Sequence, residues 1–163
     1  MIFVTVGSQK FQFNALLEAV DNLVASDAVE DGAFAQTGAC TYEPVYMDHE
    51  AFLDREGFQE RMSACDIVVT HGGTGAIIGA IKAGKKVIAV PRRVERGEHV
   101  DDHQVEIVGQ FGEMGLIEPC MDPADLPAAY DSVLAKEYLP YKSNTDCFCA
   151  ELAEQIDALV GCC

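Results

Sequence analysis

Positive charge is scarce in this sequence. Its 163 residues include 11 Lys and Arg against 27 Asp and Glu, which gives a formal net charge of −16. Nucleic-acid binding depends on clustered Lys and Arg that neutralise phosphates, so the composition argues strongly against a nucleic-acid partner. Six of the eleven basic residues fall within residues 82–96, where Arg92 and Arg93 directly follow an apolar run.

Long apolar runs are missing too. No run approaches the ~20 residues that a membrane-spanning helix needs. The N-terminal sequence M-I-F-V-T-V-G has no basic region and no small-residue cleavage site, so we interpret it as a first strand rather than a signal peptide. We therefore expect a cytoplasmic protein, and we expect residues 1–163 to form one domain with one core.

The cysteines follow no C-x-x-C pattern. Their odd number, seven, and the lack of a secretory signal do not indicate a disulfide framework. Two close pairs, Cys147 with Cys149 and Cys162 with Cys163, could bind a metal or carry a lipid, but reduced thiols are the simpler interpretation. We expect no metal and no cofactor.

Residues 67–75 are the most informative stretch and read I-V-V-T-H-G-G-T-G. The continuous β-branched run at 67–69 is typical of a strand covered on both faces of a parallel sheet. A turn follows at once, and residues 76–83 have helical character up to Gly84. Glycines let backbone N–H groups approach a ligand closely, and a helix N-terminus favours an anion. The stretch therefore predicts a phosphate-binding turn, made of His71, Gly72, Gly73, Thr74 and Gly75.

The rest of the chain alternates between strand and helix patterns. Apolar runs predict strands over residues 2–6, 33–36, 44–47, 67–69 and 87–90, and a short sixth strand at 116–117. Helical periodicity predicts helices over 13–24, with Asn14 as N-cap, and over 49–63, 76–83, 103–114, 122–136 and 146–160. This alternation predicts an α/β, Rossmann-like parallel sheet of five or six strands with helices on both faces.

Right-handed crossovers place every strand-to-helix turn of such a sheet at one edge. Ligands bind at that edge, outside the carboxyl ends of the strands. We therefore expect four turns to meet there: Gly7-Ser8, Thr37-Gly38, residues 71–75 and Pro91-Arg92. Arg92, placed by this pattern on the ligand-binding edge, is a candidate to bind an anion there.

Two common nucleotide fingerprints, G-x-G-x-x-G and G-x-x-x-x-G-K-[ST], are absent. The motifs V-V-T-H-G-G-T-G, K-A-G-K-K-V-I-A-V-P-R and D-D-H-Q instead resemble family 28 glycosyltransferases of the GT-B type. The length and motif order are similar to the small subunits of split members, namely the cytosolic subunit of the dolichol-linked N-acetylglucosaminyl transferase and bacterial exopolysaccharide relatives. The resemblance spans roughly residues 2–117.

The resemblance implies a domain equivalent to the C-terminal half of a GT-B enzyme. In that family this half binds a UDP-sugar donor, while a separate membrane-associated subunit binds the lipid-linked acceptor. Carried over by motif, the diphosphate would contact Gly7, Ser8 and residues 72–75, with a hydroxyl donor from Thr74. His103 and Gln104 would face the sugar, and the stretch near Met47 would flank the uracil. The implied reaction is an inverting hexosyl transfer, and the chain would reach the membrane only through its partner.

One position departs from the family pattern. Gly79 stands where the family usually has an acidic residue that reads the ribose hydroxyls. His71 and His103 are candidates for the general base by position, although His71 is more easily read as a structural residue of the turn. We expect the base to come from the partner, because half of a two-domain cleft cannot close over its substrate. An alternative is a non-catalytic module that binds UDP-sugar or regulates a partner. We expect the helix at 146–160 to pack on this domain or to dock the partner, with packing as the default.

Overall fold

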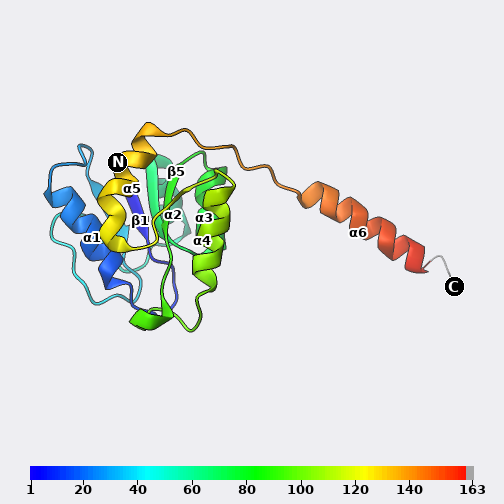
Figure 1. Ribbon diagram of the computed structural model, residues 1–163, viewed down its shortest axis with the longest axis horizontal. Helices are drawn as coiled ribbons and strands as arrows, with labels where there is room; N and C mark the ends of the chain where they lie inside the picture. Colours follow the sequence, from blue (N-terminus) through cyan, green and yellow to red (C-terminus); the bar gives the residue numbers. More distant parts are fainter. Residues whose placement is uncertain (161–163) are drawn as a thin grey trace.

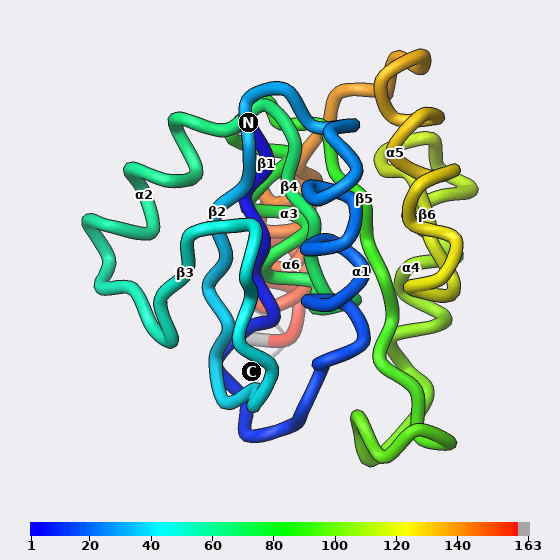
Figure 2. The backbone as a smooth tube through the Cα atoms, turned by 90° about the vertical axis from the view of Figure 1, so that its left-hand side faces the viewer, coloured from blue at the N-terminus to red at the C-terminus, as the bar shows by residue number. Residues whose placement is uncertain are grey.

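The computed structural model describes residues 1–160, and side chains up to Leu159. Its centre is a six-stranded, wholly parallel sheet in the order β3-β2-β1-β4-β5-β6. Figure 2 shows the strands side by side, with β3 at the left and β6 at the right. The order places the switch of chain direction between β1 and β4, where open α/β sheets bind ligands. The strands are β1 (Ile2–Thr5), β2 (Ala33–Gln36), β3 (Asp48–Glu50), β4 (Ile67–His71), β5 (Lys86–Val90) and β6 (Glu118–Pro119).

Helices cover both faces of the sheet, as the sequence predicted. Successive residues of a strand point to opposite faces, so Phe3 packs in one apolar cluster and Val4 in the other. The first face is covered by α2 (Arg55–Ala64), α3 (Thr74–Lys82) and α4 (His103–Glu113). The second is covered by α1 (Asn14–Ala25) and α5 (Leu126–Ala135). Two short 3-10 turns, η1 (Val94–Arg96) and η2 (Pro123–Asp125), complete the layers.

The prediction of a strand over residues 44–47 is wrong. The third strand is β3, which begins at Asp48, because the preceding backbone is held away from the sheet by a buried carboxylate. Asp21 of α1 accepts hydrogen bonds from the amides of Val45 and Tyr46, both at 2.8 Å. The next helix is correspondingly late: α2 begins at Arg55, after Asp54 caps it by accepting from the Gly57 amide at 2.8 Å, and not at residue 49.

Two smaller predictions also need correction. Asn14 is not the N-cap of α1, because its carboxamide oxygen accepts from the amides of Thr41 and Tyr42 at 3.1 Å and so holds the loop after β2. The sixth strand is β6, at residues 118–119 rather than 116–117, because the register pairs Ile88 with Glu118.

The last helix, α6 (Thr145–Val160), extends away from the rest of the molecule (Figure 1). The expectation that it packs on this domain is therefore not met. Its side chains are exposed from Thr145 to Leu159. The apolar members of its stripe lie in the open, namely Phe148, Leu152, Ile156 and Leu159.

Candidate functional site

Two glycine turns meet around one imidazole ring at the carboxyl ends of β1 and β4. A Cβ added to Gly7 would lie 2.7 Å from Cε1 of His71, and one added to Gly73 would lie 2.4 Å from its Nε2. Contacts under 3.0 Å leave no room for a side chain, and Gly7 also has a φ of +79°, which disfavours other residues. The expected convergence of the turns at 7–8 and 71–75 is thus present, with His71 as the spacer.

The His71 ring is neutral at physiological pH. Burial, assisted by the nearby charge of Arg92, lowers its pKa to about 4. Nδ1 lies 3.5 Å from the Thr5 carbonyl oxygen and 3.4 Å from Oγ1 of Thr70, whose hydroxyl already donates to that carbonyl. Both neighbours act as acceptors toward Nδ1, a pattern that favours the tautomer protonated there. A ring with such a low pKa is a weak proton acceptor, so the geometry favours a structural role for His71 over general-base catalysis.

The N-terminus of α3 offers free backbone donors beside this ring. Gly73 occupies the N-cap position without a side-chain cap, and its carbonyl accepts from the amides of Ala76 and Ile77 at 3.1 Å. Within residues 1–160, the amides of Thr74 and Gly75 donate to no protein acceptor. Unpaired amides and the helix dipole together favour an anion at this end of the helix. The side chains of Ser8 and Thr74 are exposed at the same edge.

The side chain of Gln104 packs between the turns of the site and does not face solvent. Its Oε1 accepts from the Arg92 amide at 3.1 Å, and a Cβ on Gly72 would lie 2.7 Å from its Cβ. Gln104 is buried and so ties the turn after β4 to the turn after β5. The neighbouring His103 is exposed at the start of α4, where its Nδ1 lies 3.4 Å from Glu106. Of the two residues expected to face a sugar, only His103 presents its side chain to solvent.

Arg92 lies at the expected edge but is not on the surface. Its side chain is only 1% exposed, and Nη2 donates to the carbonyl oxygens of Val6 at 2.7 Å and Phe11 at 3.4 Å. The guanidinium carbon is 5.3 Å from the centre of the Phe13 ring. Direct contact between this guanidinium and a diphosphate is therefore not what the structure offers. Its Nε and Nη1 are buried without a hydrogen-bond partner, an arrangement that typically costs about 1–3 kcal/mol per group.

Met47, which was expected to flank a uracil, does not lie beside the glycine turns. Met47 is buried in the core and precedes β3, whose first residue pairs with Phe34 at the amino end of β2. It therefore lies at the opposite edge of the sheet from the glycine turns. The residues that do follow the carboxyl end of β3 include Phe52, which is exposed, and Leu53. The sequence reasoning missed them because it ended the third strand too early.

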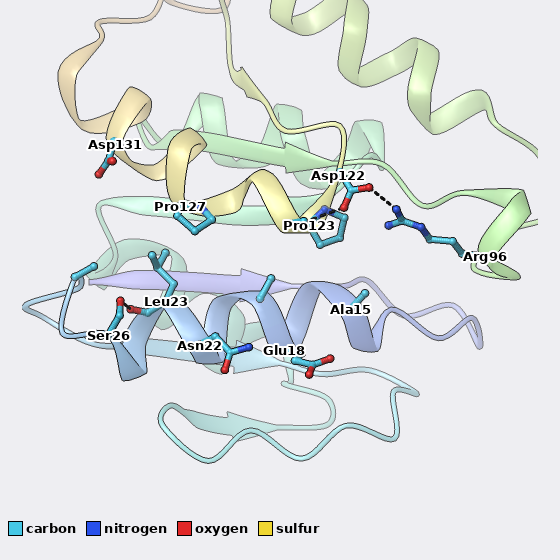
Figure 3. A pocket seen from close by; sticks show the side chains of 13 residues that line it. Ala15, Glu18, Asn22, Leu23, Ser26, Arg96, Asp122, Pro123, Pro127 and Asp131 are labelled. Atoms are coloured by element: carbon cyan, nitrogen blue, oxygen red, sulfur yellow. Dashed lines mark hydrogen bonds and ion pairs between the residues drawn. The ribbon is translucent and has the colours of Figure 1, made fainter.

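Two hollows lie between helices, one on each face of the sheet, and neither is lined by the glycine turns. One of about 430 Å³ lies between α2 and α3, where Leu53 and Phe58 face Gly79, whose Cβ position is open. A larger one of about 700 Å³ lies between α1 and η2–α5 (Figure 3), with the Arg96–Asp122 ion pair at one end.

In the described part of the chain, no group of three or more His, Cys, Asp and Glu residues could hold a metal ion. Cys147 and Cys149 are free and exposed, whereas Cys162 and Cys163 lie outside the described residues. As far as the structure describes the chain, it has no helix both long and apolar enough to cross a membrane.

Comparisons with known proteins point in one direction. A family model described as the glycosyltransferase family 28 C-terminal domain matches residues 1–158. UDP-N-acetylglucosamine transferase subunit ALG13 of Mus musculus is 27% identical over 130 residues, which covers 72% of this chain and 10% of that protein. The Homo sapiens protein of the same name is 26% identical over 126 residues, covering 73% of this chain and 11% of that protein. The chain thus spans about a tenth of the length of these curated relatives.

Solved structures show the same fold. The glycotransferase of kitacinnamycin has a TM-score of 0.60 and 18% identity, covering 83% of this chain and 35% of its own. MurG of Acinetobacter baumannii has a TM-score of 0.54 and 18% identity, covering 80% of this chain and 40% of its own. At such identities the likeness concerns the fold alone, a Rossmann-like sheet matching the C-terminal domains of GT-B glycosyltransferases.

Proposed function

The chain belongs to the family of glycosyltransferase family 28 C-terminal domains, and from this premise we propose that it is the donor-binding subunit of a UDP-sugar-dependent transferase. The observation that carries the proposal is the meeting of two glycine turns around His71, beside the free amides of Thr74 and Gly75. The diphosphate lies on these amides at the N-terminus of α3, with Gly7 and Ser8 on its other side. Thr74 adds a hydroxyl donor.

The two ends of the donor extend in opposite directions from the diphosphate. The uridine lies toward β3 and α2, where Phe52 and Leu53 follow the strand and the open position of Gly79 leaves space. The sugar lies toward the start of α4, where His103 is exposed. This assignment replaces Met47 with residues 52–53, because the uridine must lie at the same edge as the diphosphate.

The acceptor side is supplied by another protein. We propose an inverting hexosyl transfer to a lipid-linked acceptor held by a membrane-associated subunit, with this chain bound peripherally through that partner. The helix α6 supports this role, because its stripe of apolar side chains is exposed and has no cover on this domain. Its charged residues are all acidic, so the matching surface on the partner is apolar with basic flanks. The general base comes from His103 or from the partner, since the pKa of His71 is about 4.

A change of charge at Gly75 tests the diphosphate position. No atom lies within 4 Å of a Cβ there, so Gly75→Asp fits, and an acidic residue in the first turn typically stabilises a helix by about 0.3–1 kcal/mol. The same carboxylate repels a diphosphate on α3. Titration calorimetry should therefore show UDP affinity at least about tenfold weaker, equivalent to about 1.4 kcal/mol, in a variant whose melting temperature is unchanged or higher.

Gly75→Asn is the matched control, because it adds the same volume without the charge. UDP should bind it more tightly than the Asp variant. The proposal fails if the unaltered chain, assayed with its partner, does not bind UDP, or if Gly75→Asp binds UDP as tightly as Gly75→Asn.

A second candidate is a non-catalytic module that binds UDP-sugar and regulates its partner. Two observations favour it: Gly79 supplies no carboxylate for the ribose, and His71 is a poor base. The purified complex assayed with a labelled UDP-sugar separates the two functions. Transfer of label to the lipid fraction supports the transferase, whereas donor binding without transfer supports the regulatory module.

A further inference from the structure

Among the described residues, Arg92 is a buried cation that forms no ion pair. Its side chain is 1% exposed, and within residues 1–160 no carboxylate forms an ion pair with it. Only Nη2 is hydrogen-bonded, to the carbonyl oxygens of Val6 and Phe11, while Nε and Nη1 have no acceptor. A buried charge is costly unless an opposite charge compensates it. The fold therefore buries a positive charge that no carboxylate contacts within residues 1–160.

The buried acid Glu98 attracts this charge from a distance but does not pair with it. The Glu98 carboxylate accepts from the Arg93 amide at 3.0 Å, and it makes no hydrogen bond to the guanidinium of Arg92. Burial raises the pKa of Glu98, an environment that disfavours the charged carboxylate. The ring of His99, on the same loop, is tilted by 44° against the ring of Phe11, with 5.2 Å between the ring centres, and it adds no negative charge.

The position of the guanidinium relates it to the glycine turns. Val6 and Phe11, whose carbonyls it holds, bracket the turn that contains Gly7 and Ser8. The Arg92 backbone is tied through Gln104 to the turn at Gly72. The charge of Arg92 also acts on His71, whose ring lies between the two turns, and contributes to the lowered pKa of that ring.

We propose that Arg92 is a positioning residue that serves as a fixed counter-charge to the donor diphosphate, acting from beneath the two turns without touching the ligand. The proposal rests on the donor site proposed above. A charge held in a site of low dielectric acts over a longer range than an exposed one and is little screened by salt. It also needs no reorganisation when the anion binds. The apo protein carries the cost of the buried charge, and the bound diphosphate relieves it.

Arg92→Met tests the proposal, because it keeps a long side chain and removes the charge. Titration calorimetry with uridine, UMP and UDP gives a series of rising negative charge. We expect uridine affinity to be unchanged, UMP affinity to fall several-fold and UDP affinity to fall about tenfold or more. Arg92→Lys should retain most of the preference for UDP over uridine. The matched control is Arg93→Met, which makes the same charge change at a side chain that donates to the Met121 carbonyl instead.

A measurement on the unaltered chain covers the case in which neutral variants do not fold. The Nε–H resonance of Arg92 should shift on addition of UDP and stay in place with uridine. Equal losses for uridine and UDP in Arg92→Met, or an Nε–H resonance that ignores UDP while UDP is bound, would overturn the counter-charge role. Failure of the unaltered chain to bind UDP would instead contradict the donor site itself.

Discussion

The contact between Gly73 and His71 makes the sharpest prediction about the site. A Cβ on Gly73 would lie 2.4 Å from Nε2 of His71 and 3.0 Å from its Cδ2. The ring cannot withdraw freely, because it also packs against Gly7. Gly73 has a φ of −79° and a ψ of 120°, a conformation that alanine adopts without strain. Any cost of Gly73→Ala therefore comes from the clash.

The magnitude follows from two opposing effects. Overpacking of this kind costs about 1–3 kcal/mol. Replacing glycine by alanine restricts the unfolded chain and returns about 0.4–1 kcal/mol. We expect a net loss of roughly 0.5–2 kcal/mol in the free energy of unfolding, or a melting temperature lower by a few degrees. Gly75→Ala, two residues on, meets no atom within 4 Å and should instead be neutral or stabilising.

Urea denaturation of both variants, each with and without His71→Ala, completes the test. Removing the ring should relieve the penalty of Gly73→Ala and leave Gly75→Ala unaffected. The coupling energy between Gly73→Ala and His71→Ala should be about 1–3 kcal/mol in the direction of rescue. If Gly73→Ala is as stable as Gly75→Ala, or if its penalty persists without the ring, the described packing of the two turns is incorrect.

Three further predictions follow from other contacts. His71 has a pKa of about 4 in the folded chain and near 6.5 in the unfolded chain, so between these values only the unfolded state gains a proton. The free energy of unfolding should therefore fall as the pH drops from 6.5 to 4. Urea titrations of His71→Asn should show a smaller fall, by up to about 3 kcal/mol. Asp21→Asn should lower the free energy of unfolding by about 1–3 kcal/mol, because it leaves a backbone amide unpaired. Burial and the hydrogen bond to Asp21 raise the pKa of Tyr42 to about 12, so spectrophotometric titration of the variant should show a lower pKa for this tyrosine. Deleting residues 143–163, which removes α6, should leave the unfolding free energy unchanged but reduce co-purification with the acceptor subunit; an intact complex would argue against α6 as the docking element.

The centre of the fold was accessible to sequence reasoning because its signals are local. The β-branched run of β4 and the glycines after it lie next to one another in the chain, and each feature has one structural explanation. The parallel sheet then follows from the alternation of elements, and it places the turns at 7–8 and 71–75 at one edge. The family resemblance and the fold agree with that interpretation.

The errors arose where distant residues override local preference. Residues 44–47 look like a strand, but Asp21 captures their amides, and nothing within the segment itself signals that contact. Because the third strand was predicted too early in the sequence, Met47 was expected at its carboxyl end, and Phe52 and Leu53 were not recognised as the residues that follow it. Arg92 was expected to act on a ligand at the binding edge, whereas its guanidinium donates to the carbonyls of Val6 and Phe11, more than 80 residues away in sequence.

The apolar stripe of α6 illustrates a different limit. Its periodicity predicts a helix with one buried face, and the helix is present. Periodicity cannot say which surface covers that face, because packing on the same domain and docking on another chain require the same pattern. The structure leaves the stripe exposed, and the sequence of the helix does not identify the surface that would cover it.

The central claim is that UDP lies on backbone amides where the two glycine turns meet, and amide chemical shifts of the ¹⁵N-labelled full chain test it most directly. On titration with UDP, the largest shifts should fall at Gly7, Ser8 and residues 73–75, with smaller ones at 52–53. Largest shifts in the hollow between α1 and α5, or at the opposite edge near Met47, would contradict the claim.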